Sequence, residues 1–296
     1  MTAATNVSLT YPDQSFEIRP LDGGLGAEVT GLDLSVPVNE RDFARIHRAH
    51  LDHHVLVFRD QAITPEHQIA FSRRFGVLQI HVLKQFHLSG HPEILIVSNI
   101  IEHGQPLGLG DAGKFWHSDL SYKALPSLGS MLHAQELPEE GGDTLFADQH
   151  RAWDTLPDAL KRVVEGRRAA HSYTARYAEA KFEGNWRPAL SAEQLAQVQE
   201  VIHPVVRTHP ENGRKALFVS EGFTTRIIDI PEDESRQILS ELHLHSTHPE
   251  LTYRHQWQPR DMVFWDNRSL QHLAAGCPAH LRRKLYRTTI QGDAPF

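Results

Sequence analysis

Two short segments of the chain carry side chains that could hold one metal ion. His117 and Asp119 are separated by a single residue within the segment 115–122, and His272 follows a second apolar run at 262–265. In a β-strand, residues two apart point to the same face, so His117 and Asp119 could reach one ion together. Two imidazoles and one carboxylate form a facial set of ligands that suits Fe(II) and leaves three positions open for other molecules.

Two arginines follow the second of these segments. Arg283 lies eleven residues after His272, and Arg287 lies four residues further on. A guanidinium group binds a carboxylate through two parallel hydrogen bonds, which lysine cannot do. An arginine buried beside a metal without an anion would be costly, so this pattern predicts a bound carboxylate or sulfonate. The alternative is that 282–284 is a solvated run of charges.

Two other classes of protein could use the same residues. A zinc hydrolase could hold its metal with His117, Asp119 and His272 plus a water molecule, and a non-catalytic binding module could be built on the same scaffold. The hydrolase would not need Arg283 and would act without oxygen. The binding module should have lost at least one ligand, whereas all three are present. The residues alone leave both classes open beside an oxidative iron site.

Composition limits the possible partners and location. The chain has 296 residues, 30 Lys and Arg against 37 Asp and Glu, and a net charge of −7, which argues against a nucleic-acid partner. No apolar run approaches the roughly 20 residues that span a bilayer. Cys277 is the only cysteine, and the N-terminus shows no secretory signal. These features favour a cytoplasmic protein without disulfides and without a membrane partner.

The predicted elements indicate a mainly β protein. Short β-like runs recur along the chain at 55–58, 93–97, 131–133, 216–219 and 262–265. We expect helices to begin near Thr64, near Ser191 and near Pro231. The second of these helices would carry a stripe formed by Leu195, Val198 and Ile202.

The order of these elements predicts the architecture. Strands dominate both ends of the chain, and helices cluster early and between 150 and 250, which differs from regular strand–helix alternation. We therefore expect a jelly-roll core, a double-stranded β-helix of two sheets, with helices packed outside it. In the core, a turn through 276–278 would lead from His272 into an antiparallel return strand that carries Arg283 and Arg287. No repeat or linker divides the sequence, so residues 1–296 are predicted to form one domain.

Several motifs together resemble one known family. His117-x-Asp119, a distant His272 and an arginine eleven residues later match the signature of Fe(II)/2-oxoglutarate dioxygenases. Further segments resemble the family of taurine dioxygenase and 2,4-dichlorophenoxyacetate dioxygenase: 74–76, 141–144, 203–210, 221–226, 265–268, 271–272 and 287–293. The similarity runs from about residue 15 to the C-terminus.

This resemblance implies roles for individual residues. His117, Asp119 and His272 would ligate Fe(II), and 2-oxoglutarate and O₂ would complete the reaction. Arg283 would pair with the distal carboxylate of 2-oxoglutarate, and Thr144 would hydrogen-bond the same molecule. Arg287 would contact this co-substrate or the substrate. Further substrate contacts would come from His81, Leu120 and Phe223.

Two positions depart from the taurine dioxygenase pattern. Lys84 stands where that enzyme has a tyrosine, and Gly113 stands where it has an asparagine. Losing two polar contacts suited to a small amino-sulfonate argues against taurine itself. If Lys84 faces the pocket, it favours a larger anion, and the alternative is that it is a solvated loop residue.

The resemblance also implies a reaction and an assembly. The predicted substrate is a small organic anion, such as a sulfonate or an alkyl sulfate ester, with succinate and CO₂ as co-products and sulfite or sulfate plus an aldehyde as products. The alternative is the same chemistry on an aryloxy acid or another carboxylic acid. A homo-oligomer, dimeric or tetrameric, is expected.

Overall fold

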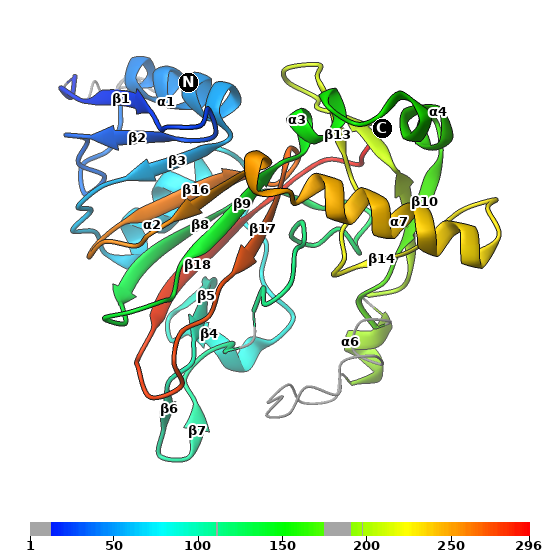
Figure 1. The fold of residues 1–296 in the computed structure, drawn as a ribbon. Helices are drawn as coiled ribbons and strands as arrows, with labels where there is room; N and C mark the ends of the chain where they lie inside the picture. Colours follow the sequence, from blue (N-terminus) through cyan, green and yellow to red (C-terminus); the bar gives the residue numbers. More distant parts are fainter. Residues whose placement is uncertain (1–12, 111, 175–190, 197) are drawn as a thin grey trace, which may run out of the picture.

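A large sheet forms the centre of the molecule (Figure 1). The computed structural model describes residues 13–110, 112–174, 191–196 and 198–296. Eight strands make up the sheet, in the spatial order β1 (Glu17–Pro20), β2 (Ala27–Thr30), β3 (Val55–Phe58), β16 (Met262–Asp266), β8 (Ser127–Glu136), β18 (Lys284–Gln291), β5 (His91–Ser98) and β4 (His87–Leu88). All neighbours are antiparallel except β2 and β3. The sheet therefore joins strands from both ends of the chain.

A smaller sheet faces the large one. Its three antiparallel strands are β15 (Thr252–His255), β9 (Thr144–Asp148) and β17 (Leu270–Ala274), with β9 in the middle. In Figure 1, β9 and β17 lie in front of the large sheet. Apolar side chains fill the space between the sheets: Phe146 and Leu270 from the small sheet join Leu132, Val263 and Trp265 from the large one. This core carries the metal-binding segments described below.

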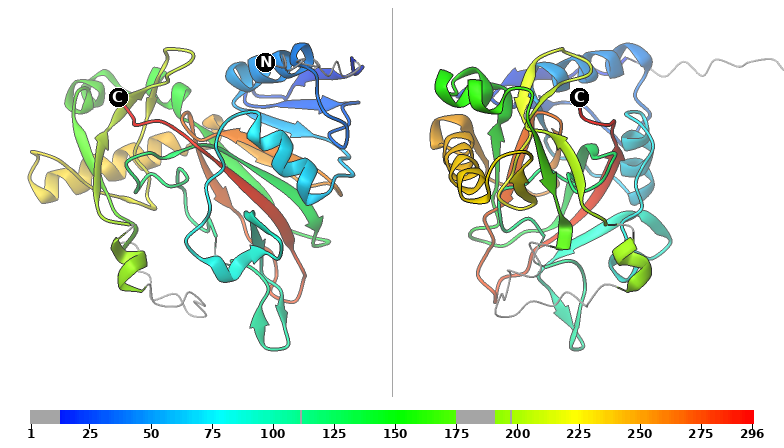
Figure 2. Two further views of the ribbon diagram at one scale, coloured as in Figure 1. Left: turned by 180° about the vertical axis from the view of Figure 1, so that it is seen from behind. Right: turned by 90° about the vertical axis from the view of Figure 1, so that its right-hand side faces the viewer.

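Two helices cover the opposite face of the large sheet. Helices α1 (Glu40–His53) and α2 (Pro65–Arg73) lie on that face, as the view from behind shows (Figure 2). Ile46 of α1 and Phe71 of α2 pack with Phe58 and Phe264 from the sheet. Thr64 caps α2 by accepting a hydrogen bond from the His67 backbone nitrogen, as its position before Pro65 predicts.

A third group of elements lies beside the small sheet. It comprises β10 (Arg168–His171), β11 (Val201–Pro204), β14 (Thr224–Ile227), the hairpin of β12 (Val206–Thr208) and β13 (Lys215–Leu217), and helices α3 (Gln149–Asp154), α4 (Asp158–Val164), α6 (Ala192–Ala196) and α7 (Glu232–Ser246). Most of these surround their own apolar cluster, which includes Val205, Leu217 and Leu242.

The remaining elements are short. They are a hairpin of β6 (Ile101–Glu102) with β7 (Gln105–Pro106), and the 3-10 turns Lys84–Phe86 and Pro249–Leu251. Within the described ranges, none of the helices is both long and apolar enough to cross a membrane.

The structure confirms the mainly β architecture with peripheral helices. All five predicted apolar runs contribute to strands, β3, β5, β8, β13 and β16. The helix expected near Pro231 is α7, which buries Ile238, Leu239 and Leu242.

The helix predicted after Ser191 is present as α6, and Ser191 Oγ caps it by accepting from the Gln194 backbone nitrogen, but the predicted apolar stripe is wrong. Helix α6 ends at Ala196, and Ile202 lies on β11 with 43% of its surface exposed. Val198 is buried, whereas Leu195 is 41% exposed. The helical spacing of these three apolar residues is therefore not a buried stripe.

Two expectations about the site-bearing segments are also wrong. His117 forms an isolated β-bridge with His272, and the chain then turns, with Leu120 at a positive φ of 58°, so 115–122 is not a strand. The segment after the turn at 276–278 does not pair with β17. It becomes β18 of the large sheet, so the two strands belong to opposite sheets.

Candidate metal centre

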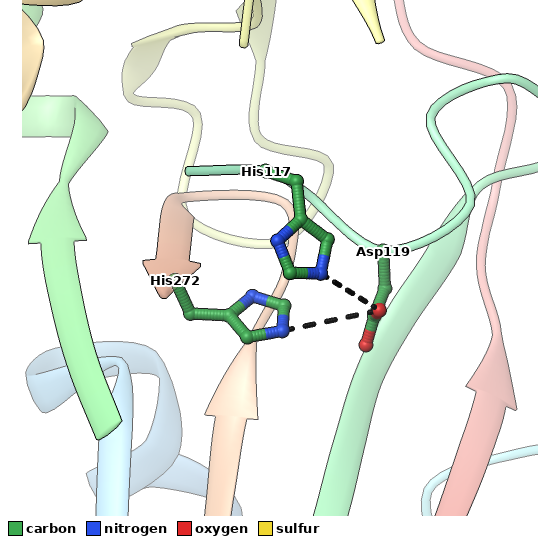
Figure 3. A group of neighbouring side chains, drawn as sticks. All are labelled: His117, Asp119 and His272. Carbon is green, nitrogen blue, oxygen red and sulfur yellow. Dashed lines mark ion pairs between the residues drawn. The ribbon is translucent and has the colours of Figure 1, made fainter. Parts of the chain in front are cut away.

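Three side chains from distant segments meet between the two sheets (Figure 3). His117 Nε2 lies 3.6 Å from Asp119 Oδ1, and His272 Nε2 lies 3.9 Å from the same oxygen. One atom from each residue lies within 4.8 Å of the others, and all three residues are buried. In the part of the chain that the structure describes, this is the one cluster of its kind. The three residues predicted as ligands are thus brought together.

Backbone pairing places the two imidazole rings side by side. The His117 backbone nitrogen donates to the His272 carbonyl at 3.1 Å, and the His272 nitrogen donates to the His117 carbonyl at 2.9 Å. The ring centroids are 4.1 Å apart. The bridge therefore positions His117 beside His272, while the turn that follows, and not a continuous strand, brings Asp119 to them.

Asn267 holds the backbone of Asp119 in place. Its Oδ1 accepts from the Asp119 backbone nitrogen at 2.5 Å, and its Nδ2 donates to the carbonyls of Asp119 and Ser127 at 2.9 and 3.0 Å. Ser130 Oγ donates to Asp119 Oδ2 at 2.7 Å, so Oδ1 is the oxygen that faces the imidazoles. No sequence motif singled out Ser130.

Hydrogen bonding and burial favour the protonation states that a metal requires. His117 Nδ1 lies 2.9 Å from the Phe115 carbonyl, so it carries the proton and leaves the Nε2 lone pair for an ion. Burial, and then the neighbouring His117, lower the pKa of His272 well below its usual value. Burial alone would raise the pKa of Asp119, but the charge of Arg287 and the nearby imidazoles lower it well below its usual range. Two neutral imidazoles and one carboxylate fit a divalent ion.

A cavity beside this cluster contains the predicted co-substrate residues. Thr144, Arg283 and Arg287 line it together with His117 and His272. The Thr144 hydroxyl accepts a hydrogen bond from Trp257 Nε1 at 3.1 Å, which leaves its own proton for a ligand.

Arg283 is a buried cation without a carboxylate partner. It is 8% exposed, its Nε donates to the Gly142 carbonyl at 3.1 Å, and no described carboxylate lies within ion-pair distance. Burial lowers its pKa to about 10, so the guanidinium stays charged at neutral pH. An unpaired buried charge of this kind favours an anionic ligand in the cavity.

Arg287 reaches the cluster from strand β18. Its Nη1 lies 3.4 Å from Asp119 Oδ1, and its buried Nε has no hydrogen-bond partner within the described ranges. Arg287 lines the same cavity as Thr144 and Arg283.

A second cavity contains two of the predicted substrate residues. His81 and Leu120 line it with Thr289. His81 Nδ1 accepts from the Leu83 backbone nitrogen at 3.2 Å, so its Nε2 carries the proton and can act as a donor.

The other two predicted substrate residues lie in different environments. The Phe223 ring lies 5.9 Å from the His117 ring and 4.9 Å from Tyr122, in a small buried aromatic cluster. Lys84 is exposed at the start of its 3-10 turn and is not among the residues lining either of these cavities. Its role stays a prediction.

The structure adds one cation that sequence reasoning missed. Lys123, four residues after Asp119, lines the same cavity as His81 and Leu120. The short distance from the His-x-Asp motif was the available signal, but the turn that directs Lys123 is not visible in the sequence.

Comparisons with known proteins agree with this geometry. The family described as "Taurine catabolism dioxygenase TauD, TfdA family" matches residues 17–289. An alpha-ketoglutarate-dependent 2,4-dichlorophenoxyacetate dioxygenase from Cupriavidus pinatubonensis is 34% identical over 93% of this chain and 98% of its own. An alkylsulfatase from Acinetobacter baylyi is 32% identical, over 95% and 87%. The crystal structure of a taurine dioxygenase from Burkholderia xenovorans has a TM-score of 0.79 and 32% identity, covering 95% and 91%.

Proposed function

Because the chain belongs to the TauD, TfdA family and is a 2-oxoglutarate-dependent dioxygenase, we propose that it hydroxylates a small organic anion. The observation that carries this proposal is the pairing of a His117–Asp119–His272 cluster with an adjoining cavity that contains the unpaired buried Arg283. A metal and an anionic co-substrate would then lie side by side. A zinc hydrolase or a binding module would have no use for that arginine.

The residues of the site would have separate roles in binding the metal and the co-substrate. His117, Asp119 and His272 would hold Fe(II). Arg283 would pair with the far carboxylate of 2-oxoglutarate, and the Thr144 hydroxyl would donate to it. When bound, Fe(II) and 2-oxoglutarate together activate O₂ for insertion of one oxygen atom into a C–H bond, with succinate and CO₂ as co-products.

The chain's own side chains would mainly orient the substrate and keep water out. The Phe115 and Phe223 rings contact His117, the Tyr122 ring contacts Phe223, and together they would offer an apolar wall to the substrate. His81 Nε2–H and the backbone at Leu120 would be donors to an acidic group in the second cavity. No side chain needs to act as an acid or base in cleaving the C–H bond.

Both the cavities and the relatives support a proposal for the substrate class. Relatives of similar identity are named for three different anions: an aryloxy carboxylate, an alkyl sulfate and the sulfonate taurine. An apolar wall beside hydrogen-bond donors suits an anion with an apolar body. We therefore propose a sulfonate or alkyl sulfate ester, which would release sulfite or sulfate and an aldehyde. An aryloxy acid, favoured by the aromatic cluster, is the second candidate.

Two structural proposals accompany this function. The facing sheets that hold the ligands are proposed to be a double-stranded β-helix, and the whole chain one domain. The support is that the large sheet joins strands from Glu17 to Gln291, so neither half of the chain completes the sheet alone.

An aerobic assay would test the reaction. The Fe(II)-loaded protein and 2-oxoglutarate would be mixed with hexyl sulfate, hexanesulfonate, taurine or 2,4-dichlorophenoxyacetate, and succinate would be measured. We expect one of these acids to raise succinate formation, and His117→Ala to abolish it. Arg254→Ala, which removes an exposed ion pair with Asp143, is the matched surface control. Succinate formation that survives His117→Ala, or that no acid stimulates, would contradict the proposal.

A further inference from the structure

Lys123 occupies the junction between the inner cavity and the surface. Leu120, which follows Asp119 in the sequence, lines a cavity together with Lys123 and His81. A wider open hollow adjoins it and shares Lys123 and Tyr122 as lining residues. Lys123 is therefore shared by the outer hollow and the inner cavity that contains Leu120.

The backbone of Lys123 is fixed on both sides. Its nitrogen donates to the Leu120 carbonyl at 2.8 Å, and its carbonyl accepts from His203 Nε2 at 2.9 Å. These bonds close the turn that begins at Asp119. The position of Lys123 therefore depends on backbone contacts, and a change of its side chain should leave the turn intact.

The ammonium group of Lys123 is partly desolvated and has no counter-charge among the residues that the structure describes. Within the described residues it forms no ion pair, and its side chain is half-buried. Burial lowers its pKa, and no neighbouring carboxylate opposes that effect. Pairing with an anionic ligand would offset the cost of this partial burial.

We propose that Lys123 is a specificity-determining residue whose ammonium group pairs with the acidic group of the substrate. The ligand class is an organic anion, a carboxylate, sulfate or sulfonate, whose apolar part extends past Leu120 toward the metal. This inference rests on the proposed function. It adds Lys123 to the predicted substrate contacts, beside His81, which lines the same cavity.

Binding measured without turnover tests the assignment. The Fe(II)- and 2-oxoglutarate-loaded protein would be titrated calorimetrically in the absence of oxygen with hexyl sulfate and 2,4-dichlorophenoxyacetate. Uncharged 1-hexanol and 2,4-dichlorophenoxyacetamide would serve as matched probes. We expect Lys123→Met to weaken binding of the better anion about tenfold, the effect of losing one charged hydrogen bond. Binding of its uncharged counterpart should change less than twofold.

Two further variants separate charge from shape. Lys123→Arg keeps the cation and should retain most of the affinity. Lys114→Met removes a lysine that is exposed and lies outside both hollows, so it should leave the affinity unchanged. A loss of similar size for the charged and uncharged probes would overturn the assignment, because it would point to cavity shape.

The remaining outcomes are also decisive. Equal binding by wild type and Lys123→Met, or no binding of either anion by wild type, would overturn the role of Lys123. If the anion binds through Lys123 but no tested acid stimulates succinate formation, the assignment stands and the proposed hydroxylation fails. If an acid stimulates succinate formation with the same KM in both proteins, the hydroxylation stands and the assignment fails.

Discussion

Arg282 and Arg283 are neighbours in the sequence but lie in opposite environments. The Arg282 side chain is 51% exposed and pairs with Glu136 and Glu102. Arg283 is buried and has no described carboxylate partner. The sequence left open whether 282–284 is a solvated charge run or an anion site. In the structure, Arg282 fits the first description and Arg283 fits the second.

This contrast yields a matched pair of variants. Arg283→Lys keeps the charge but loses the planar group that can bind a carboxylate with two hydrogen bonds. We expect the KM for 2-oxoglutarate to rise roughly 30-fold, corresponding to about 2 kcal/mol for a charged hydrogen bond. Arg282→Lys should change it less than twofold. Steady-state rates at varied 2-oxoglutarate concentration measure both, and equal effects would contradict the role given to Arg283.

At the scale of elements, the metal cluster depends on a junction between three segments. Asn267, in the loop after β16, is buried and forms hydrogen bonds with Asp119 in the turn after the His117 bridge and with Ser127 at the start of β8. The loop holds Asp119 through its backbone, while Ser130 on β8 holds the carboxylate. The geometry of the ligands is therefore fixed by contacts outside the ligand set.

Asn267→Ala should disturb both stability and metal binding. The change removes three buried hydrogen bonds and leaves the Asp119 N–H without its partner, so the free energy of unfolding should fall by about 3 kcal/mol. Iron affinity should fall as well, because the turn that carries Asp119 is released. Chemical denaturation and iron titration are the measurements. Asn212→Ala, which removes one hydrogen bond in a distant hairpin, is the control. Unchanged iron affinity in a destabilised Asn267→Ala protein would refute the positioning role.

The elements that the sequence predicted well are those with strong local signals. The apolar runs at 55–58 and 262–265 became strands β3 and β16, and the cap at Thr64 began α2. The helix expected from Ser191 begins as predicted but is shorter than its apolar spacing suggests, because that spacing cannot reveal that Ile202 belongs to β11. Pairing with β10 overrode the local pattern there.

The candidate site shows the same limit. The metal ligands and Arg283 could be predicted because their spacing forms a motif that is visible in the sequence. Ser130 was not found because its contact with Asp119 depends on register: it lies opposite Thr289 on one side and Trp265 on the other. Lys123 was missed because its direction depends on a turn with a positive φ at Leu120. Long-range pairing and backbone turns are not readable from one sequence.

At the scale of the whole molecule, charge is distributed unevenly. The chain has a net charge of −7, yet Arg283 and Arg287 line one interior cavity and Lys123 lines the other. A surface with excess negative charge repels small anions. The cations that line the two cavities would attract such anions to the site. This arrangement agrees with an anionic co-substrate and an anionic substrate.

The many histidines give the molecule a second overall property. Of the 21 histidines, His50, His54, His150 and His171 are buried, and burial is the first cause that lowers each pKa. The pKa falls to about 3 for His50 and His171 and to about 4 for His54 and His150. These rings stay neutral in the folded chain at pH values where the unfolded chain is protonated.

Stability should therefore decline as the solution becomes acidic. Well above pH 6.5 these rings are neutral in both the folded and the unfolded chain, so they do not lower the free energy of unfolding. Below pH 6.5 the unfolded chain takes up protons that the folded chain refuses until pH about 3 to 4. At pH 5 each buried ring should lower the free energy of unfolding by about 2 kcal/mol. The sum over four such rings approaches the total stability of a typical domain.

His171 allows this to be tested one ring at a time. Neither of its ring nitrogens has a hydrogen-bond partner within the described ranges, and the ring stacks on Phe218 with centroids 5.6 Å apart. His171→Phe should keep this packing and shrink the loss of unfolding free energy between pH 7 and 5 by about 2 kcal/mol. Urea denaturation at both pH values measures the loss, with the exposed His280→Gln as control. If His171→Phe loses as much stability as wild type, protonation of the unfolded chain at this residue does not cause the acid sensitivity. The cause would then lie with the other buried rings, whose stability cost adds to that of His171 only where the sites are independent.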